Sequence, residues 1–201
     1  MCTISAGTVT LVSVGSCSLN ANQSGNAFYT AASQVSQSFN VTSVTITFDS
    51  NFGTSMTSTQ SIISPNGIAL ANNAFSRTGY TFTGWALSPG GQVAYSDHQN
   101  AAFAYDTTLY AVWIANNYGV TYFANGADGG AVPVDSTTYN IGQAINVRSN
   151  TGSLVRTGYT FGGWNTAANG SGFTYNSGNT VTMGAQSVLL YAIWTPNTYL
   201  I

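Results

Sequence analysis

The pair Asp97-His98 is the first place in this sequence where residue types could support catalysis. A histidine beside a carboxylate can act as a general base, but it must hold a nucleophile within hydrogen-bonding reach. Adjacent residues of a strand point to opposite faces, and no nucleophile shares the surroundings of this pair. His98 is also the only histidine of the chain. We therefore expect no catalytic site here, and the chain is not expected to be an enzyme.

Metal ligands and cysteines are equally sparse. Five acidic residues, one histidine and two cysteines are scattered without the spacing of a zinc or calcium site, so we expect neither metal nor cofactor. Cys2 and Cys17 are separated by two β-like runs. Either they form a disulfide across neighbouring strands, which requires an exported chain, or they are two small buried thiols.

A repeated phrase uses two of the three basic residues: "RTGYTFTGW" begins at Arg77 and "RTGYTFGGW" at Arg156. No carboxylate partner is repeated with them, because Asp106 of the first copy has no acidic counterpart in the second and Asp49 aligns with Ala124. Each arginine is therefore expected to bond backbone carbonyls or to lie over an aromatic ring, a structural role; a recurring ligand contact is the alternative. The predicted structural residues are Arg77, Gly79, Tyr80, Phe82, Gly84, Trp85 and Trp113, with Arg156, Gly158, Tyr159, Phe161, Gly163, Trp164 and Trp194.

The four tryptophans could serve as stacking platforms for sugars or as core residues. Each buried tryptophan removes about 150–250 Å² from water, or roughly 4–6 kcal/mol at about 25 cal/mol per Å². A module of roughly 75 residues buries a small share of its surface and can hardly leave such side chains in solvent. The core is therefore the expected place for all four.

Composition excludes other classes of function. The chain is 44% hydrophobic and 4% charged, with a net charge of −2. Three arginines cannot neutralise the phosphates on which nucleic-acid affinity depends, so no nucleic-acid partner is expected. No basic amphipathic segment and no apolar run of about 20 residues is present, which argues against membrane insertion. A secreted type of composition without an export signal predicts a piece of a longer exported protein.

Hydrophobic alternation predicts a mainly β fold, α+β at most. In "VTITF", Val44, Ile46 and Phe48 point to one face. In "GYTFTGW", Tyr80 and Phe82 are expected on one face and Trp85 on the other, and "LYAVW" is apolar on both faces like a central strand. A short helix over Gly67–Phe75 remains an alternative to irregular structure.

The combination R-T-G-Y-T-F-x-G-W, L-Y-A-x-W and a preceding V-T-x-x-F strand resembles the internalin-type B-repeat, also called the Listeria–Bacteroides repeat. This resemblance implies small β-grasp-like modules, strung in tandem on bacterial surface and secreted proteins. We assign residues 43–116 to the first module, 117–198 to the second, and 199–201 to the start of a third. Residues 1–42 resemble the C-terminal part of a bacterial Ig-like β-sandwich.

Even repetition without a unique polar cluster predicts a spacer or stalk in an extracellular or cell-surface protein. The alternative is an adhesin that binds a glycan, a cell-wall polymer or a host surface protein. Polar, tyrosine-rich loops such as Trp164–Asn179 favour that alternative, with Tyr175 as the candidate ligand contact.

Overall fold

The computed structural model describes residues 1–64 and 66–199, and these form strands joined by turns, without a helix. The mainly β fold expected from the alternation is therefore confirmed. Clustering of backbone contacts divides the chain into two compact units, residues 1–76 with 82–113, and residues 77–81 with those from 114 onward. Leu200 and Ile201, on which the expected third repeat depends, lie outside the described residues.

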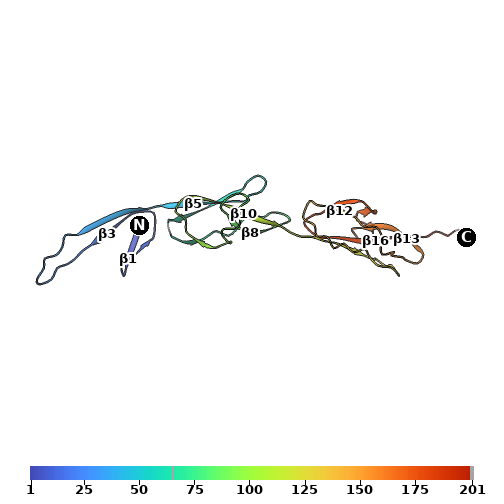
Figure 1. The fold of residues 1–201 in the computed structure, drawn as a ribbon, viewed down its shortest axis with the longest axis horizontal. Coiled ribbons are helices and arrows are strands. Elements are labelled where there is room, and N and C mark those ends of the chain that lie inside the picture. The colour runs from blue at the N-terminus through green and yellow to red at the C-terminus, as the bar shows by residue number, and fades with distance from the viewer. Residues whose placement is uncertain (65, 200–201) are drawn as a thin grey trace. The chain divides into compact units, whose positions relative to one another are not determined.

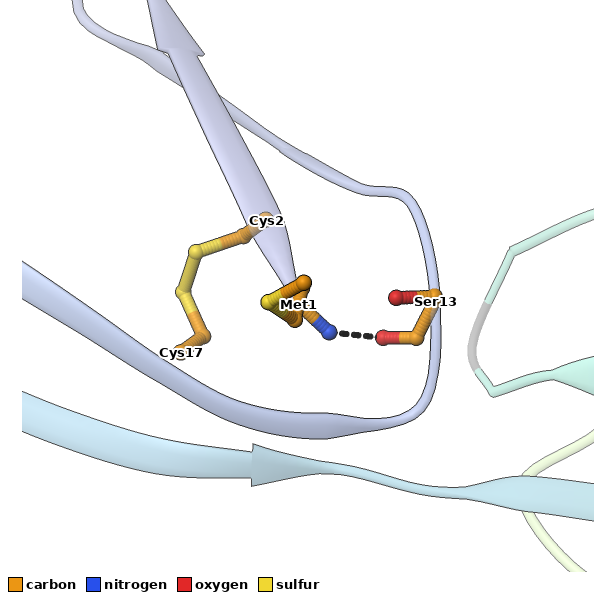
Figure 2. Close-up of a disulfide and its surroundings, with 4 residues drawn as sticks. All are labelled: Met1, Cys2, Ser13 and Cys17. Atoms are coloured by element: carbon orange, nitrogen blue, oxygen red, sulfur yellow. Dashed lines mark hydrogen bonds between the residues drawn. A yellow bond between two sulfur atoms is a disulfide. The ribbon is translucent and has the colours of Figure 1, made fainter.

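Two antiparallel hairpins precede the first repeat. One pairs β1 (Cys2–Ser5) with β2 (Thr8–Leu11), and the other pairs β3 (Gly15–Ala21) with β4 (Val35–Val41). A disulfide joins Cys2 to Cys17 across a Cα–Cα distance of 5.5 Å, and the amino group of Met1 donates to the Ser13 carbonyl oxygen (Figure 2). Almost all other side chains of β3 and β4 are exposed, so this segment has no core comparable with those of the repeats.

The first module contains a four-stranded sheet in the order β6-β5-β10-β8. Its strands are β5 (Ser43–Asp49), β6 (Thr57–Ile63), β8 (Tyr80–Ala86) and β10 (Thr107–Ala115). Figure 1 labels β5, β8 and β10 of this sheet. The first of them, β5, pairs antiparallel with β6 and parallel with β10. A short second sheet pairs β7 (Ile68–Ala69) with β9 (Asn100–Ala101). The expected central position of "LYAVW" is confirmed, because β10 has a strand on each side.

The second module repeats this plan in the order β11-β16-β13-β14. Its strands are β11 (Val120–Phe123), β13 (Tyr159–Asn165), β14 (Thr174–Tyr175) and β16 (Val188–Pro196), with the short pair β12 (Ala144–Asn146) and β15 (Thr180–Thr182). Again the first and last strands, β11 and β16, are parallel neighbours. Among the described residues, no strand of this module corresponds to β6.

Each module encloses a hydrophobic core of its own. As expected, the alternating side chains of β5 point inward. The first core contains Val44, Ile46, Phe48, Ile62, Leu70, Trp85, Ala101, Phe103, Leu109 and Ala111. The second contains Val120, Tyr122, Ile145, Val147, Leu154, Trp164, Met183, Leu190 and Ala192. Because each core is complete within one module, each repeat buries its apolar residues by itself.

The simple alternation expected along "GYTFTGW" is wrong. Phe82 and Trp85 face the same core, with ring centroids 4.9 Å apart. Between them Gly84 takes a φ of 145°, and in the second module the β13–β16 ladder shifts register between Phe161 and Gly163. A bulge places one extra residue in the strand, which turns the following side chain to the other face.

A helix over Gly67–Phe75 is also wrong, because this segment contains β7 and irregular backbone. The side chain of Asn73 explains the irregular part: its Oδ1 accepts a hydrogen bond from the Phe75 N–H at 2.9 Å. Such local bonds from asparagine compete with the hydrogen bonds of a helix. The Asn73 N–H donates to Asp97 at 2.9 Å, which further commits this backbone to a non-helical path.

Candidate functional site

Both repeated arginines lie over a tyrosine ring. The guanidinium carbon of Arg77 is 3.6 Å from the ring centroid of Tyr80, and that of Arg156 is 4.1 Å from the centroid of Tyr159. In each copy the tyrosine N–H donates to the arginine carbonyl at 3.0 Å, closing a turn that brings the ring under the cation. The glycine before each tyrosine has a φ near +78°, as a type II turn requires at its third residue. The contact with an aromatic face, one of the two arrangements expected from the sequence, is therefore present in both copies.

The second copy also places a carboxylate near its arginine, which the alignment of the repeats did not indicate. The pKa of Asp128 is lowered, chiefly because its carboxylate accepts a hydrogen bond from the Thr157 N–H, at 2.7 Å. The positive charge of Arg156 adds to this effect. This carboxylate is fully solvated, so we assign it a local role in the turn.

The four tryptophans fall into two pairs. Trp85 and Trp164 are fully buried, in agreement with the core expectation. Trp113 and Trp194 are only half-buried, and the expectation that they too lie inside the core is wrong. Both occur towards the ends of the central strands and pack against the edge of their cores. Their indole N–H groups donate to backbone carbonyls, at 2.8 Å for Trp113 and 3.2 Å for Trp194.

In each module an asparagine joins the end of the first strand to the central strand by a hydrogen bond. The equivalence of these two asparagines was not predicted from the sequence. Asn51 and Asn125 have φ angles of 57° and 47°. Their amide nitrogens donate to the carbonyls of Ala111, at 3.0 Å, and Ala192, at 2.8 Å. Asparagine tolerates this left-handed conformation better than most residues do. An Asn three residues after the core aromatic is the signal that could have revealed the pair.

These asparagines also correct the alignment of the two repeats. The core aromatic of the first module is Phe48, and its counterpart is Tyr122 rather than Phe123. Each packs against the buried tryptophan of its module, with centroids 4.8 Å and 4.7 Å apart. Asp49 consequently corresponds to Phe123 and not to Ala124.

The structure places Tyr175 against the second core, with its backbone paired to Trp164 across β14 and β13. The loop between them is organised by the fully buried Asn165. Its amide nitrogen donates to two loop carbonyls and to the Thr174 hydroxyl, and its oxygen accepts from two backbone N–H groups. Tyr175 is thus partly buried, whereas Phe173 is the loop aromatic with high exposure, 77%.

Asp97 and His98 are both engaged in holding local backbone. The Asp97 carboxylate accepts the Asn73 N–H, and His98 Nδ1 lies 3.0 Å from the carbonyl oxygen of Leu70. Within residues 1–64 and 66–199, no group of three or more histidine, cysteine or acidic side chains is arranged to hold a metal ion.

A charged pair absent from the sequence-based expectations lies in the second module. Arg148 Nη2 is 3.1 Å from Asp135 Oδ1, and 1% of the Asp135 side chain is exposed against 43% for Arg148. Burial alone raises the pKa of Asp135, but hydrogen bonds from Arg148, Thr137 and Tyr139 outweigh it and the pKa is lowered. The same pairing raises the pKa of Arg148.

Beside this pair is a hollow of about 530 Å³, lined by Asp135, Tyr139, Ala144, Asn146, Val147, Arg148, Ser149 and Thr151. Its volume falls within the usual range of small-molecule sites, about 300–1,000 Å³. The remaining hollows include one of about 160 Å³ beside Arg156 and Trp194. The larger hollow is distinguished from that one by a charged pair whose carboxylate, Asp135, is buried.

Comparison with known families explains the repeated scaffold. The family model described as the Listeria–Bacteroides repeat domain matches twice in tandem, at residues 45–112 and 118–193. The two matches together cover more than half of the chain. The chain belongs to the Listeria–Bacteroides repeat domain family. This is a non-catalytic repeat domain. The resemblance of residues 1–42 to an Ig-like domain stays a prediction.

Two proteins of Evansella cellulosilytica are similar to this chain. One, named "Putative Gly-rich membrane protein", is 41% identical over 130 residues, which are 62% of this chain and 15% of that protein. The other, named "Putative membrane protein", is 36% identical over 121 residues, 60% of this chain and 18% of that protein. The chain therefore spans less than a fifth of the length of these relatives. No solved structure matches it. Within the described part of the chain, no helix has the length and hydropathy to span a membrane.

These Listeria–Bacteroides repeats contain residues common to both copies and residues unique to one copy. The arginine–tyrosine turn, the buried tryptophan and the asparagine at the end of the first strand occur in both repeats, so they form the scaffold. The Arg148–Asp135 pair occurs in the second repeat alone among the described residues. A search for repeated phrases favours the first kind and passes over the second, because a feature unique to one repeat leaves no periodic signal.

Proposed function

We propose that this chain is a spacer in a bacterial surface or secreted protein and that its repeats bear tension along the chain. The observation that carries the proposal is the arrangement of the first and last strands of each module. These strands are adjacent and parallel, β5 with β10 and β11 with β16. In each repeat the chain thus enters and leaves through two strands that bond directly to each other.

This arrangement determines how a stretched module resists. Thr107 to Tyr110 of β10 are in register with Ile46 to Asp49 of β5, and both strands run in the same direction. A pull on the start of β5 and the end of β10 therefore slides one strand along the other. All hydrogen bonds between the strands must then fail together, whereas pulling from one end of the pair would break them one after another. The second module has the same geometry over Val120 to Phe123.

Chemistry of the chain supports an extracellular place for this spacer. The Cys2–Cys17 disulfide is of a kind that persists in oxidising environments outside the cytosol. With 4% charged residues, the surface is built from neutral polar side chains, as is common in secreted β proteins. The relatives named as membrane proteins are much longer than this chain, so a spacer segment between other parts accords with their size.

Single-molecule force spectroscopy tests the proposal on the full chain. Handles attached at Ser43 and Ala115 load β5 and β10 in the sliding geometry, and handles at Ser43 and Thr107 load the same strands from one end. We expect the first geometry to require several-fold more force. Each event should release about 20–25 nm of chain, from roughly 70 residues of about 3.4 Å. Equal forces in the two geometries would contradict a tension-bearing role.

A further inference from the structure

The hollow beside Arg148 is built around a carboxylate that no ligand can reach. Asp135 Oδ1 accepts hydrogen bonds from Arg148 Nη2 and the Thr137 N–H, both at 3.1 Å, and Oδ2 accepts from the Tyr139 hydroxyl at 3.0 Å. With 1% of its side chain exposed, Asp135 is fully engaged by these groups. It therefore acts as an anchor that positions a guanidinium and an aromatic ring at the wall of the hollow.

The backbone of Arg148 is anchored as well. Its N–H donates to the Tyr122 hydroxyl at 2.9 Å, and its carbonyl accepts the indole N–H of Trp164 at 2.9 Å. Tyr122 and Trp164 both belong to the second core. The arginine thus extends from a rigid position, and little conformational freedom remains to be lost when a ligand binds.

The accessible groups of the hollow are donors and neutral polar side chains. The Arg148 side chain is 43% exposed, and within the described residues its Nε and Nη1 atoms have no hydrogen-bond acceptor. Asn146, Ser149 and Thr151 are exposed residues of the lining whose side chains make no hydrogen bonds to the described part of the chain. Tyr139 adds a half-buried ring to the same wall.

Charge and chemistry together define the ligand. Asp135 already balances the charge of Arg148, so an anion gains little from this site, whereas hydroxyl groups can use every free donor and acceptor. A pyranose ring also carries C–H groups that pack on an aromatic ring. We propose that this hollow binds an uncharged saccharide unit. This function goes beyond the spacer role and uses a different place from Tyr175.

The first module supplies an internal control, because it lacks the site. Leu70 and Val147 occupy equivalent positions, each directly after the first strand of the short pair in its module. The Leu70 N–H donates to the Gln99 carbonyl, and the Val147 N–H donates to the Asn179 carbonyl. The residue after each is therefore equivalent too, so Ala71 takes the place of Arg148. There the Ala71 N–H donates to the Gln60 side chain, and no guanidinium is present.

The test is an NMR titration of the full chain with glucose, and separately with propionate as a carboxylate without hydroxyl groups. We expect saturable shifts of the Arg148, Ser149 and Thr151 amides with glucose in the millimolar range, weaker binding of propionate, and no shift at Ala71. Propionate binding as tightly as glucose would overturn the saccharide assignment. So would an absence of saturable shifts, or shifts of equal size at Ala71.

Variants separate binding from folding. The double change Asn146→Ala with Thr151→Ala removes two exposed side chains that support no other residue, so thermal unfolding should stay unchanged while glucose affinity falls at least threefold. Thr59→Ala, at an exposed threonine of β6 in the first module, is the matched control and should leave affinity unchanged. Unaltered affinity in the double variant would overturn the proposed site.

Discussion

Trp85 and Trp164 occupy equivalent buried positions, yet among the described residues only one of their indole N–H groups has a hydrogen-bond partner. Trp164 Nε1 donates to the Arg148 carbonyl at 2.9 Å. Trp85 Nε1 is buried and has no partner among the described residues. Replacing each tryptophan by phenylalanine removes similar apolar area, because both side chains are 0% exposed. The two substitutions should therefore differ mainly through the N–H group.

The size of that difference follows from the energetics of hydrogen bonds. Trp164→Phe deletes a bond with a net contribution of about 0.5–1.5 kcal/mol. Trp85→Phe deletes a buried donor without a partner, and this relieves a desolvation penalty of about 1–3 kcal/mol. We therefore predict that Trp164→Phe destabilises its module by about 2 kcal/mol more than Trp85→Phe does. In the first module, relief of the penalty offsets part of the lost packing.

Native-state hydrogen exchange can measure each module within the intact chain. The amides of Ala111 and Ala192 lie in the buried central strands and report on the first and second modules, respectively. A difference of about 2 kcal/mol corresponds to roughly 30-fold in exchange rate. Losses that agree within about 0.5 kcal/mol, or a larger loss for Trp85→Phe, would refute the reasoning, since the area terms are matched.

Three further outcomes can be measured with the same chain. Gly163→Ala should destabilise the second module by about 1–3 kcal/mol in thermal unfolding, because φ is +115° and a Cβ would lie 2.9 Å from a carbonyl oxygen of β14. Gly162→Ala is the control, because its Cβ would lie 3.3 Å from the nearest atom, the side-chain oxygen of Thr195. Asp135→Asn should destabilise at pH 7 in urea unfolding. The pKa of Asp135 is lowered in the folded chain, so the carboxylate contributes to the free energy of unfolding above the usual aspartate pKa of about 3.9. That contribution is lost as the pH falls through the lower folded pKa. A difference in stability from the wild type that persists at pH 2 would contradict this. Reducing Cys2–Cys17 should weaken exchange protection in β3 by up to about 3 kcal/mol and leave both repeat cores unchanged; loss of either core would contradict it.

Local patterns predicted the strands well, because each repeat alternates apolar and polar residues over a half-buried sheet. They failed at the bulge between Phe161 and Gly163 and at the equivalent segment around Gly84, since one extra residue reverses every later assignment of faces while changing no composition. They also predicted full burial for Trp113 and Trp194, which are half-buried. The burial of a residue near a strand end depends on how far the strand extends past its neighbours, and sequence alone does not give that length.

The Arg148–Asp135 pair could not be predicted for a different reason. The short strand β12 and otherwise irregular backbone separate the two residues, and the position of Arg148 depends on its backbone hydrogen bonds to Tyr122 and Trp164. Neither residue lies in the repeated phrase. The match of Asp49 with Ala124 is wrong by one residue because the repeated phrase aligns Phe48 with Phe123, although Tyr122 is the buried counterpart of Phe48.

The order of strands along the chain also governs when a module can fold during synthesis. In both modules the central strand is the last one to be made, and the first strand waits some 60 residues for its parallel neighbour. Until β10 or β16 emerges, the earlier strands lack the partner that joins them and leave their apolar faces uncovered. Each repeat consequently stays unfolded through most of its own translation, the state in which a chain can pass through a narrow export channel. Folding then proceeds one repeat at a time, starting from the end that emerges first.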